Sequence, residues 1–188
     1  MTGLNGNGED MNSFGLLRKD IKNYYERSKC RNLFNFLCIL LQTPSLWAVI
    51  SFRIGSMLMD LYVIRTLYVF LIWNPVRMIT GIEIYPRTVI GENLYIKHFG
   101  GIFIHPRSKI GNNCLIFNDV TIGSNFEETA FPVIGDNVTI GVGAKIIGGI
   151  HVGNNAIVGA NAVVVKDVPD GAVVFGNPAS FKLNEGKN

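Results

Sequence analysis

Two segments interrupt an otherwise regular sequence, and they carry the side chains best suited to chemistry. The first, residues 97–101, holds His98 beside a pair of glycines, which let another backbone approach closely. An imidazole there can take a proton from a hydroxyl near neutral pH, as few other side chains can. The second, residues 124–132, is expected to protrude as a loop. A lone histidine at such a place is more often a solvated surface residue, so the surrounding pattern must decide its role.

The regular part repeats an aliphatic residue at every sixth position, and glycine follows many members of the series. A short strand and a corner in each hexad stack these side chains into an inner column, where each rung is buried only against the next. The pattern therefore predicts a mainly β protein, a β-helix built from hexapeptide repeats. The series consists of Ile84, Ile90, Ile96, Ile104, Ile110, Ile116, Ile122, Ile134, Ile140, Ile146, Val152, Val158 and Val164.

Three hexads make a triangular coil of about 18 residues. Residues 84–169 then provide roughly four to five coils, more than the minimum of about three that a stable solenoid needs. Glu83 precedes His98 by fifteen residues, which is close to the length of one coil. The carboxylate and the imidazole can therefore face each other across adjacent rungs.

The N-terminal part has helical periodicity instead. Residues 13–80 are predicted to form a helical cap of four helices, the second of which ends or kinks at Pro44. We expect residues 1–12 to be disordered, residues 81–172 to form the β-helix domain, and residues 173–188 to form a C-terminal wrap and a loose tail.

An almost entirely apolar run, residues 61–73, raises the question of membrane contact. Arg65 interrupts the run and Asn74-Pro75 ends it well short of the ~20 residues that a spanning helix needs, so we expect it not to cross a bilayer. Two partners remain open for its apolar side: neighbouring subunits with the end of the solenoid, or the inner face of a membrane. The expected face carries Trp47, Tyr68, Phe70 and Trp73, bordered by Arg53, Arg65 and Arg77.

Composition excludes several other classes. The formal net charge of +3 comes without a basic block interleaved with aromatic residues, which argues against nucleic acid as a partner. Cys30, Cys38 and Cys114 form no CxxC pair, and the N-terminus lacks the features of a signal peptide. We therefore expect a cytoplasmic protein, with peripheral attachment to the inner membrane face left open.

A series of motifs resembles the serine O-acetyltransferases of the hexapeptide-repeat acyltransferase superfamily, in order and in near-equal spacing. The resemblance implies left-handed coils, a homotrimer or a dimer of trimers, and one active site at each subunit interface. It also implies His98 as general base, Glu83 as the carboxylate that orients it, acetyl-CoA as co-substrate, and no metal. The matching segments are Glu83-Ile84-Tyr85-Pro86, His98, Val120-Thr121-Ile122-Gly123, Gly141-Val142-Gly143-Ala144-Lys145-Ile146 and Gly176-Asn177-Pro178-Ala179.

The same resemblance implies a groove for acetyl-CoA between subunits. Lys166 and Lys182 would meet the nucleotide phosphates as point charges. The plainer interpretation of the glycines is that they only form the turns of the hexads. The residues expected to line the groove are Gly123, Ser124, Gly141, Val142, Gly159 and Ala160.

The acceptor side departs from the family. An Asp-Pro-Ala segment of the family corresponds to Ser28-Lys29-Cys30, and an Arg-His-Pro segment corresponds to Ala130-Phe131-Pro132. Without that arginine, the carboxylate of a free amino acid lacks its natural bidentate partner. Phe99, Phe126 and Phe131 instead offer aromatic surface that suits a sugar ring. The sequence therefore predicts a saccharide O-acetyltransferase of capsule or exopolysaccharide synthesis, with serine O-acetyltransferase of cysteine synthesis as the alternative.

The histidine spacing and the retained motifs argue against two other classes of protein. A γ-type carbonic anhydrase needs three histidine ligands, two of them five residues apart, whereas His98, His105 and His151 lie at intervals of seven and forty-six. His105 and His151 are accordingly expected to be surface residues. A non-catalytic structural solenoid would keep the hexads but would have no reason to retain Glu83, His98 and the interrupting loop, and it would not bind CoA.

Overall fold

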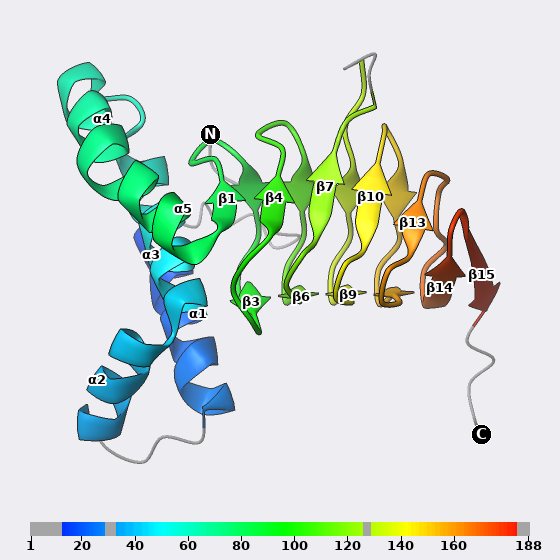
Figure 1. Cartoon of the computed structure of the whole chain (residues 1–188), viewed down its shortest axis with the longest axis horizontal. Coiled ribbons are helices and arrows are strands. Elements are labelled where there is room, and N and C mark those ends of the chain that lie inside the picture. Colours follow the sequence, from blue (N-terminus) through cyan, green and yellow to red (C-terminus); the bar gives the residue numbers. More distant parts are fainter. Residues whose placement is uncertain (1–12, 29–32, 126–128, 184–188) are drawn as a thin grey trace.

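Helices occupy one end of the molecule and a stack of β-coils forms the rest (Figure 1). The computed structural model describes residues 13–28, 33–125 and 129–183. Both parts match the predicted fold class, a parallel β-helix preceded by helices. The helices are α1 (Ser13–Arg27), α2 (Leu33–Gln42), α3 (Pro44–Leu58), α4 (Tyr62–Tyr68), the π-helical turn η1 (Val69–Trp73) and α5 (Asn74–Thr80).

The coils have three sides, and each side is a sheet whose strands come from successive coils. The five-stranded sheet has the order β1-β4-β7-β10-β13, the four-stranded sheet β11-β8-β5-β2, and the six-stranded sheet β15-β14-β12-β9-β6-β3. The strands of the first sheet are β1 (Ile82–Ile84), β4 (Ile102–Ile104), β7 (Thr121–Gly123), β10 (Lys145–Ile147) and β13 (Val163–Val164). Those of the second are β2 (Val89–Ile90), β5 (Lys109–Ile110), β8 (Val133–Ile134) and β11 (His151–Val152). Those of the third are β3 (Tyr95–Ile96), β6 (Leu115–Ile116), β9 (Thr139–Ile140), β12 (Ile157–Val158), β14 (Ala172–Gly176) and β15 (Ala179–Leu183).

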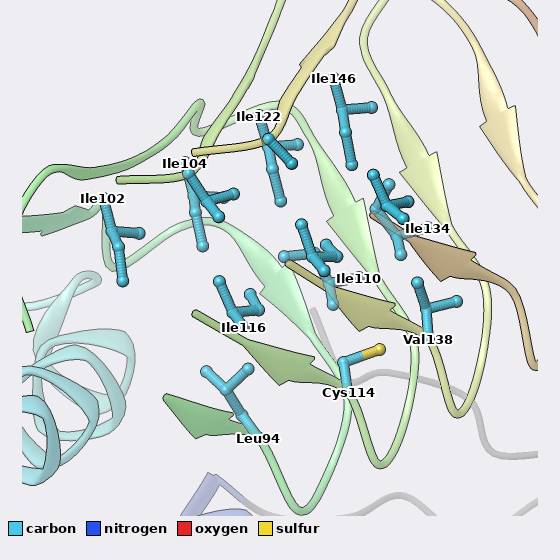
Figure 2. Close-up of a cluster of buried hydrophobic side chains, with 14 of the residues drawn as sticks. Leu94, Ile102, Ile104, Ile110, Cys114, Ile116, Ile122, Ile134, Val138 and Ile146 are labelled. Carbon is cyan, nitrogen blue, oxygen red and sulfur yellow. The ribbon is translucent and has the colours of Figure 1, made fainter. Parts of the chain in front are cut away.

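The core is a set of aliphatic columns inside this prism. Ile84, Ile104, Ile122 and Ile146 are in register on the five-stranded sheet, and each is at most 2% exposed. Figure 2 shows how such columns from the three sides meet in the interior, together with Cys114 and Val138 at a corner. Full burial of one such side chain contributes about 1.5–3 kcal/mol. The hexad series of the sequence is therefore the interior of the fold.

One corner of the prism, between the four-stranded and six-stranded sheets, is held by polar side chains. Asn112 Oδ1 accepts a hydrogen bond from the backbone N–H of Glu92 at 3.0 Å. Asp136 Oδ1 in turn accepts one from the backbone N–H of Asn112 at 2.6 Å. Asn154 and Asp170 continue the ladder in the following coils. The next residue at this corner is in the left-handed region, with φ of 56–58°, which asparagine tolerates better than most residues. These residues are Asn93, Asn113, Asn137 and Asn155.

The two interruptions of the repeat fall at corners and leave the columns in place. Ile84 pairs with Ile104 and Ile104 with Ile122, so the first two coils advance by 20 and 18 residues. Ile122 pairs with Ile146, an advance of 24 residues across the loop of residues 124–132. The inward side chains stay stacked because the extra residues leave the coil only where the chain turns.

A buried ion pair fastens the helices to the first coil. The Arg53 Nε of α3 lies 2.8 Å from the Asp20 Oδ2 of α1, and the two side chains are 3% and 0% exposed. Arg53 also donates to the Ile90 carbonyl at 2.8 Å, and Asp20 accepts the Leu94 N–H at 2.9 Å. Burial raises the pKa of Asp20, and the Arg53 guanidinium opposes that shift. Both charges thus depend on each other and on backbone groups of the coil.

The π-helical turn changes which aromatic residues face inward. Tyr68 and Trp73 lie five residues apart yet are both buried, because a π-turn holds more residues than an α-turn. The Tyr68 hydroxyl donates to the Ser51 carbonyl, and Trp73 Nε1 donates to the Ile84 carbonyl at 3.0 Å. The predicted face with Tyr68, Trp73 and Arg53 was therefore wrong, since all three side chains point into the protein. Among the helices of the described ranges, none is both long enough and apolar enough to span a bilayer.

The far end of the stack closes with a hairpin. β14 pairs in parallel with β12 of the preceding coil, and β15 then pairs with β14 in the antiparallel direction. The register joins Val173 to Lys182 and Gly176 to Ala179. The last strand of the six-stranded sheet therefore runs against all the others.

The Asp20–Arg53 pair yields a stability prediction. Asp20→Ala leaves the Arg53 guanidinium buried without its partner, so the free energy of unfolding should fall by about 3–5 kcal/mol. Replacing both residues with apolar side chains, Asp20→Leu with Arg53→Met, should recover much of that loss. Urea unfolding followed by circular dichroism would measure both effects, with the exposed pair variant Lys22→Ala as a control. A single variant as stable as the wild type would contradict the assigned role.

Candidate active site

His98 lies at the corner where the chain passes from the six-stranded sheet to the five-stranded sheet, directly after β3. Its side chain is exposed, and its ring centroid lies 6.1 Å from that of Phe117 in the next coil. The Lys97 ammonium lies 5.0 Å from the centroid of the same Phe117 ring. We call this corner the His98 edge, and it continues through residues 117–120, 141–144 and 159–162 of the later coils. The imidazole is thus accessible to a second molecule.

Glycines shape the backbone that carries His98. Gly101 has φ of +68°, and a Cβ there would lie 3.0 Å from the Cα of Asp119 in the next coil. Gly81, which caps α5, approaches so closely that a Cβ on it would lie 3.2 Å from the Cα of Gly100. The glycine pair therefore lets the end of the helical region and the second coil both pack against the histidine segment.

Glu83 projects outward from β1, where its ion-pair partner is Arg77. Its Oε2 atom lies 3.0 Å from Nη1 of Arg77, and both side chains are more than a third exposed. The Arg77 guanidinium also lies 4.8 Å from the Trp73 ring centroid. No hydrogen bond joins Glu83 to His98 within the described ranges. Arg77 was expected beside an apolar face rather than at Glu83, because the helix and the strand that bring the two residues together were predicted separately.

A second cluster lies at the next corner, between the five-stranded and four-stranded sheets, which we call the loop edge. Phe131 stacks on His105 with centroids 4.5 Å apart and an interplanar angle of 18°, and the Arg107 guanidinium lies 5.3 Å from the same ring. The backbone N–H of Arg107 donates to His105 Nδ1 at 3.1 Å. His105, predicted as a surface residue, is therefore half-buried under the loop. Phe126, predicted with Phe131 to bind the acceptor, lies outside the described residues.

Sequence reasoning missed His105 and Arg107 as members of this cluster. They belong to the second coil, whereas Phe131 enters from the loop of the third coil. Only the stacking of coils, with the extra residues of the loop counted correctly, brings the three side chains together.

The residues predicted to line the acetyl-CoA groove divide between the two edges. One group lies on the His98 edge, in the third and fourth coils, and a second lies on the loop edge. Lys182 is on β15, where its ammonium lies 6.0 Å from the Phe175 ring centroid. The first group is Gly141, Val142, Gly159 and Ala160, and the second is Gly123, Ser124 and Lys166. Phe99 lies on the His98 edge, away from Phe131.

Packing accounts for two of the glycines in the predicted groove. A Cβ on Gly141 would lie 2.8 Å from the Ala160 backbone nitrogen, and one on Gly159 would lie 3.0 Å from the Val174 carbonyl oxygen. These positions need glycine because the next coil lies directly on them. Gly123 is different, since a Cβ there would lie 3.7 Å from the Phe103 ring, an ordinary contact.

The buried Cys114 thiol and two surface pockets do not contribute to the site at His98. Burial raises the pKa of the Cys114 thiol to about 11, so this cysteine stays protonated and unreactive near neutral pH. Two pockets of the described chain lie elsewhere, one beside α1 and one between α4 and the corner at Tyr85. Neither the Cys114 thiol nor these two pockets therefore adds a group to the His98 edge.

Comparison with known proteins decides the family. The serine acetyltransferase of Synechococcus elongatus is 34% identical over 177 residues, which cover 92% of this chain and 70% of that protein. This chain belongs to the serine acetyltransferase family. Residues 131–166 match the model of the bacterial transferase hexapeptide, described as six repeats.

Solved serine acetyltransferases have the same fold. The enzyme of Neisseria gonorrhoeae superposes on this chain with a TM-score of 0.80 at 32% sequence identity. The match covers 94% of this chain and 67% of the Neisseria chain. A serine acetyltransferase solved in complex with CoA has a TM-score of 0.77 at 30% sequence identity. The match covers 90% of this chain and 69% of the chain in that complex. The predicted enzyme class, an O-acetyltransferase that uses acetyl-CoA, is thus confirmed.

The comparisons overturn the prediction of a saccharide acceptor from capsule or exopolysaccharide synthesis. The relatives and the structural neighbours are serine acetyltransferases, which was the alternative. That prediction relied on Ser28-Lys29-Cys30 and Ala130-Phe131, which lack the aspartate and the arginine of the family, and on the aromatic residues near them. Similarity over most of the chain outweighs these local departures. A cation also lies beside Phe131, because Arg107 packs against this ring from the neighbouring coil.

Two glycines of the predicted groove give a paired test. Gly141→Ala should lower the free energy of unfolding by about 1–3 kcal/mol, because its Cβ meets backbone atoms that cannot move aside. Gly123→Ala should leave the unfolding midpoint within error, because its Cβ fits. Thermal unfolding measures both. If Gly123→Ala also raises the KM for acetyl-CoA, that glycine belongs to the groove, whereas equal destabilisation by the two variants would contradict the packing argument.

Proposed function

We propose that this protein is a serine O-acetyltransferase, which transfers the acetyl group of acetyl-CoA to the hydroxyl of L-serine with His98 as general base. The observation that carries the proposal is the exposed imidazole at the glycine-lined corner, in a chain whose family membership covers 92% of its length. The complex of a related serine acetyltransferase with CoA supports the choice of donor.

The active site in this proposal lies between two copies of the chain, in a trimer or a dimer of trimers. The predicted CoA residues and the aromatic residues near them are divided between the His98 edge and the loop edge, which are separated by the five-stranded sheet. A groove that contains both sets can form only if the His98 edge of one copy meets the loop edge of another. Rotational symmetry then repeats the same contact at each interface.

The chemistry in this groove is a direct transfer. An imidazole nitrogen of His98 removes the proton from the serine hydroxyl while the oxygen attacks the thioester carbonyl carbon. The carbon–sulfur bond breaks as the tetrahedral intermediate collapses, and the protonated imidazole returns its proton to the leaving thiolate. The products are O-acetylserine and CoA. Backbone N–H groups of the coil corners are candidates for stabilising the oxyanion.

Arg107 supplies the cation that the serine carboxylate requires. Its guanidinium is held on the face of Phe131, and its backbone N–H is fixed by His105, so the side chain leaves the coil in a defined direction. A guanidinium matches a carboxylate bidentately, which a point charge does not. The aromatic ring at position 131 therefore serves as a platform for Arg107.

Glu83 enters the proposal as a residue that positions His98. Its ion pair with Arg77 is partly exposed, and such pairs contribute only about 0–1 kcal/mol. The carboxylate can therefore exchange Arg77 for the imidazole at little cost when substrates fill the groove. Lys166 and Lys182 are kept as partners of the CoA phosphates.

The central test is acetyl-CoA consumption with L-serine as acceptor, followed through release of the CoA thiol. His98→Ala should reduce kcat by about 10²–10⁴-fold, the usual contribution of a general base. His151→Ala, an exposed histidine on the four-stranded sheet, should leave the rate unchanged. Serine-dependent turnover that survives the loss of His98 would refute the mechanism, and absence of any serine-dependent turnover would refute the function.

The assignment of Arg107 is tested separately. Arg107→Gln should raise the KM for serine by about tenfold, because a charged hydrogen bond to the carboxylate is lost, while the KM for acetyl-CoA stays unchanged. Lys109→Gln removes the same charge two residues away and should change neither constant. Equal effects of the two variants would mean that only the local charge matters and would exclude a specific contact.

A further inference from the structure

The helix of residues 62–80 presents an unusually apolar outer surface. α4, η1 and α5 follow one another without a break, and Tyr68 and Trp73 fill the inner side. Figure 1 shows the α4 end of this helix standing clear of the coils. We call its outward residues the outer apolar face: Val63 (68% exposed), Leu67 (54%), Phe70 (73%), Leu71 (62%), Met78 (80%) and Ile79 (65%). An exposed apolar patch of this extent normally marks an interaction site.

Basic side chains predominate beside this face. Residues 61–80 contain two arginines and no acidic residue, and Asp60 lies in the turn before them. Arg77 is neutralised by Glu83. Arg65 instead lines a pocket of roughly 600 Å³ with Arg87 from the first coil. Its other lining residues are Thr66, Val69, Phe70, Asn74 and Tyr85, so the pocket contains two guanidinium groups and no carboxylate.

We propose that the outer apolar face lies on a bilayer that contains anionic phospholipid, with a lipid phosphate seated in the pocket between Arg65 and Arg87. The apolar side chains would enter the boundary between headgroups and acyl chains, with the helix axis parallel to the surface. At that depth the pocket beside Phe70 meets the level of the phosphates, and guanidinium groups bind phosphate bidentately. Arg87 and Tyr85 belong to the first-coil part of the loop edge, so this inference requires that the contact between copies proposed above leaves that coil free.

Charge favours a lipid surface over a second copy of the same chain as the occupant. A two-fold contact through this face would bring the arginine pockets of both copies together, and neither pocket offers a carboxylate to pair with them. An anionic membrane instead supplies the missing negative charge and the apolar phase at the same time.

Flotation of the purified protein with lipid vesicles tests the proposal. We expect binding to vesicles of equimolar phosphatidylcholine and phosphatidylglycerol, and much weaker binding to phosphatidylcholine alone. Arg65→Gln with Arg87→Gln should weaken partitioning onto the anionic vesicles by about 30-fold at low salt, roughly fivefold for each arginine near the surface. Leu67→Ser with Phe70→Ser should abolish binding to both kinds of vesicle.

Matched controls separate this face from general surface properties. Lys109→Gln removes an exposed charge and Phe175→Ser an exposed aromatic ring away from the face, and both should bind as the wild type does. The proposal would be overturned if the control variants lost vesicle binding while the variants of the outer apolar face kept it. A fall in oligomeric mass for Leu67→Ser with Phe70→Ser, measured by sedimentation without lipid, would also overturn it, because a second copy would then cover the face. Competition by inorganic phosphate that abolishes vesicle binding would assign the pocket to a free anion instead.

Discussion

Stacking of one coil upon the next is the constraint on which the rest of this molecule depends. Each coil buries its isoleucines only against its neighbours, and the corner amides bond to side chains of the following coil. A wall residue therefore cannot change its direction without disturbing the coils on both sides. Freedom exists only at corners, where extra residues leave the stack without shifting it. His98 and the loop of residues 124–132 both occupy such corners, where this fold can present side chains that the stacking does not constrain.

The interior of the β-helix could be predicted from the sequence because a period of six is a local property. Every member of the aliphatic series from Ile84 to Val164 is buried. The helical end was harder to predict from the sequence. The side of residues 62–80 that faces inward depends on a π-turn, and the hydrophobic periodicity does not indicate such a turn. An ideal α-helical count places Tyr68 and Trp73 on different sides, whereas the structure buries both. Arg53 was expected at a surface for a similar reason, since its partner Asp20 is thirty-three positions away.

The candidate site was predictable in its single residues but not in its groupings. His98 stands out by its glycine neighbours, and Glu83 by its distance from His98, yet the carboxylate contacts Arg77. The cluster of His105, Arg107 and Phe131 depends on two coils of different lengths and left no local signal. The saccharide acceptor inferred from Phe131 was overturned by the family relationship, which covers most of the chain. The structure adds that this ring packs against Arg107, a contact that no local pattern indicates.

The antiparallel strand β15 has a consequence for how the molecule behaves at high concentration. A stack of parallel coils ends in an exposed strand edge, which is a template for adding the next chain and hence for aggregation. β15 covers β14 with a strand of opposite direction, so a parallel coil of another molecule meets the wrong hydrogen-bonding pattern at this side. The helices cover the other end through Arg53 and Gly81. Growth of a fibre from these coils is thus blocked at both ends.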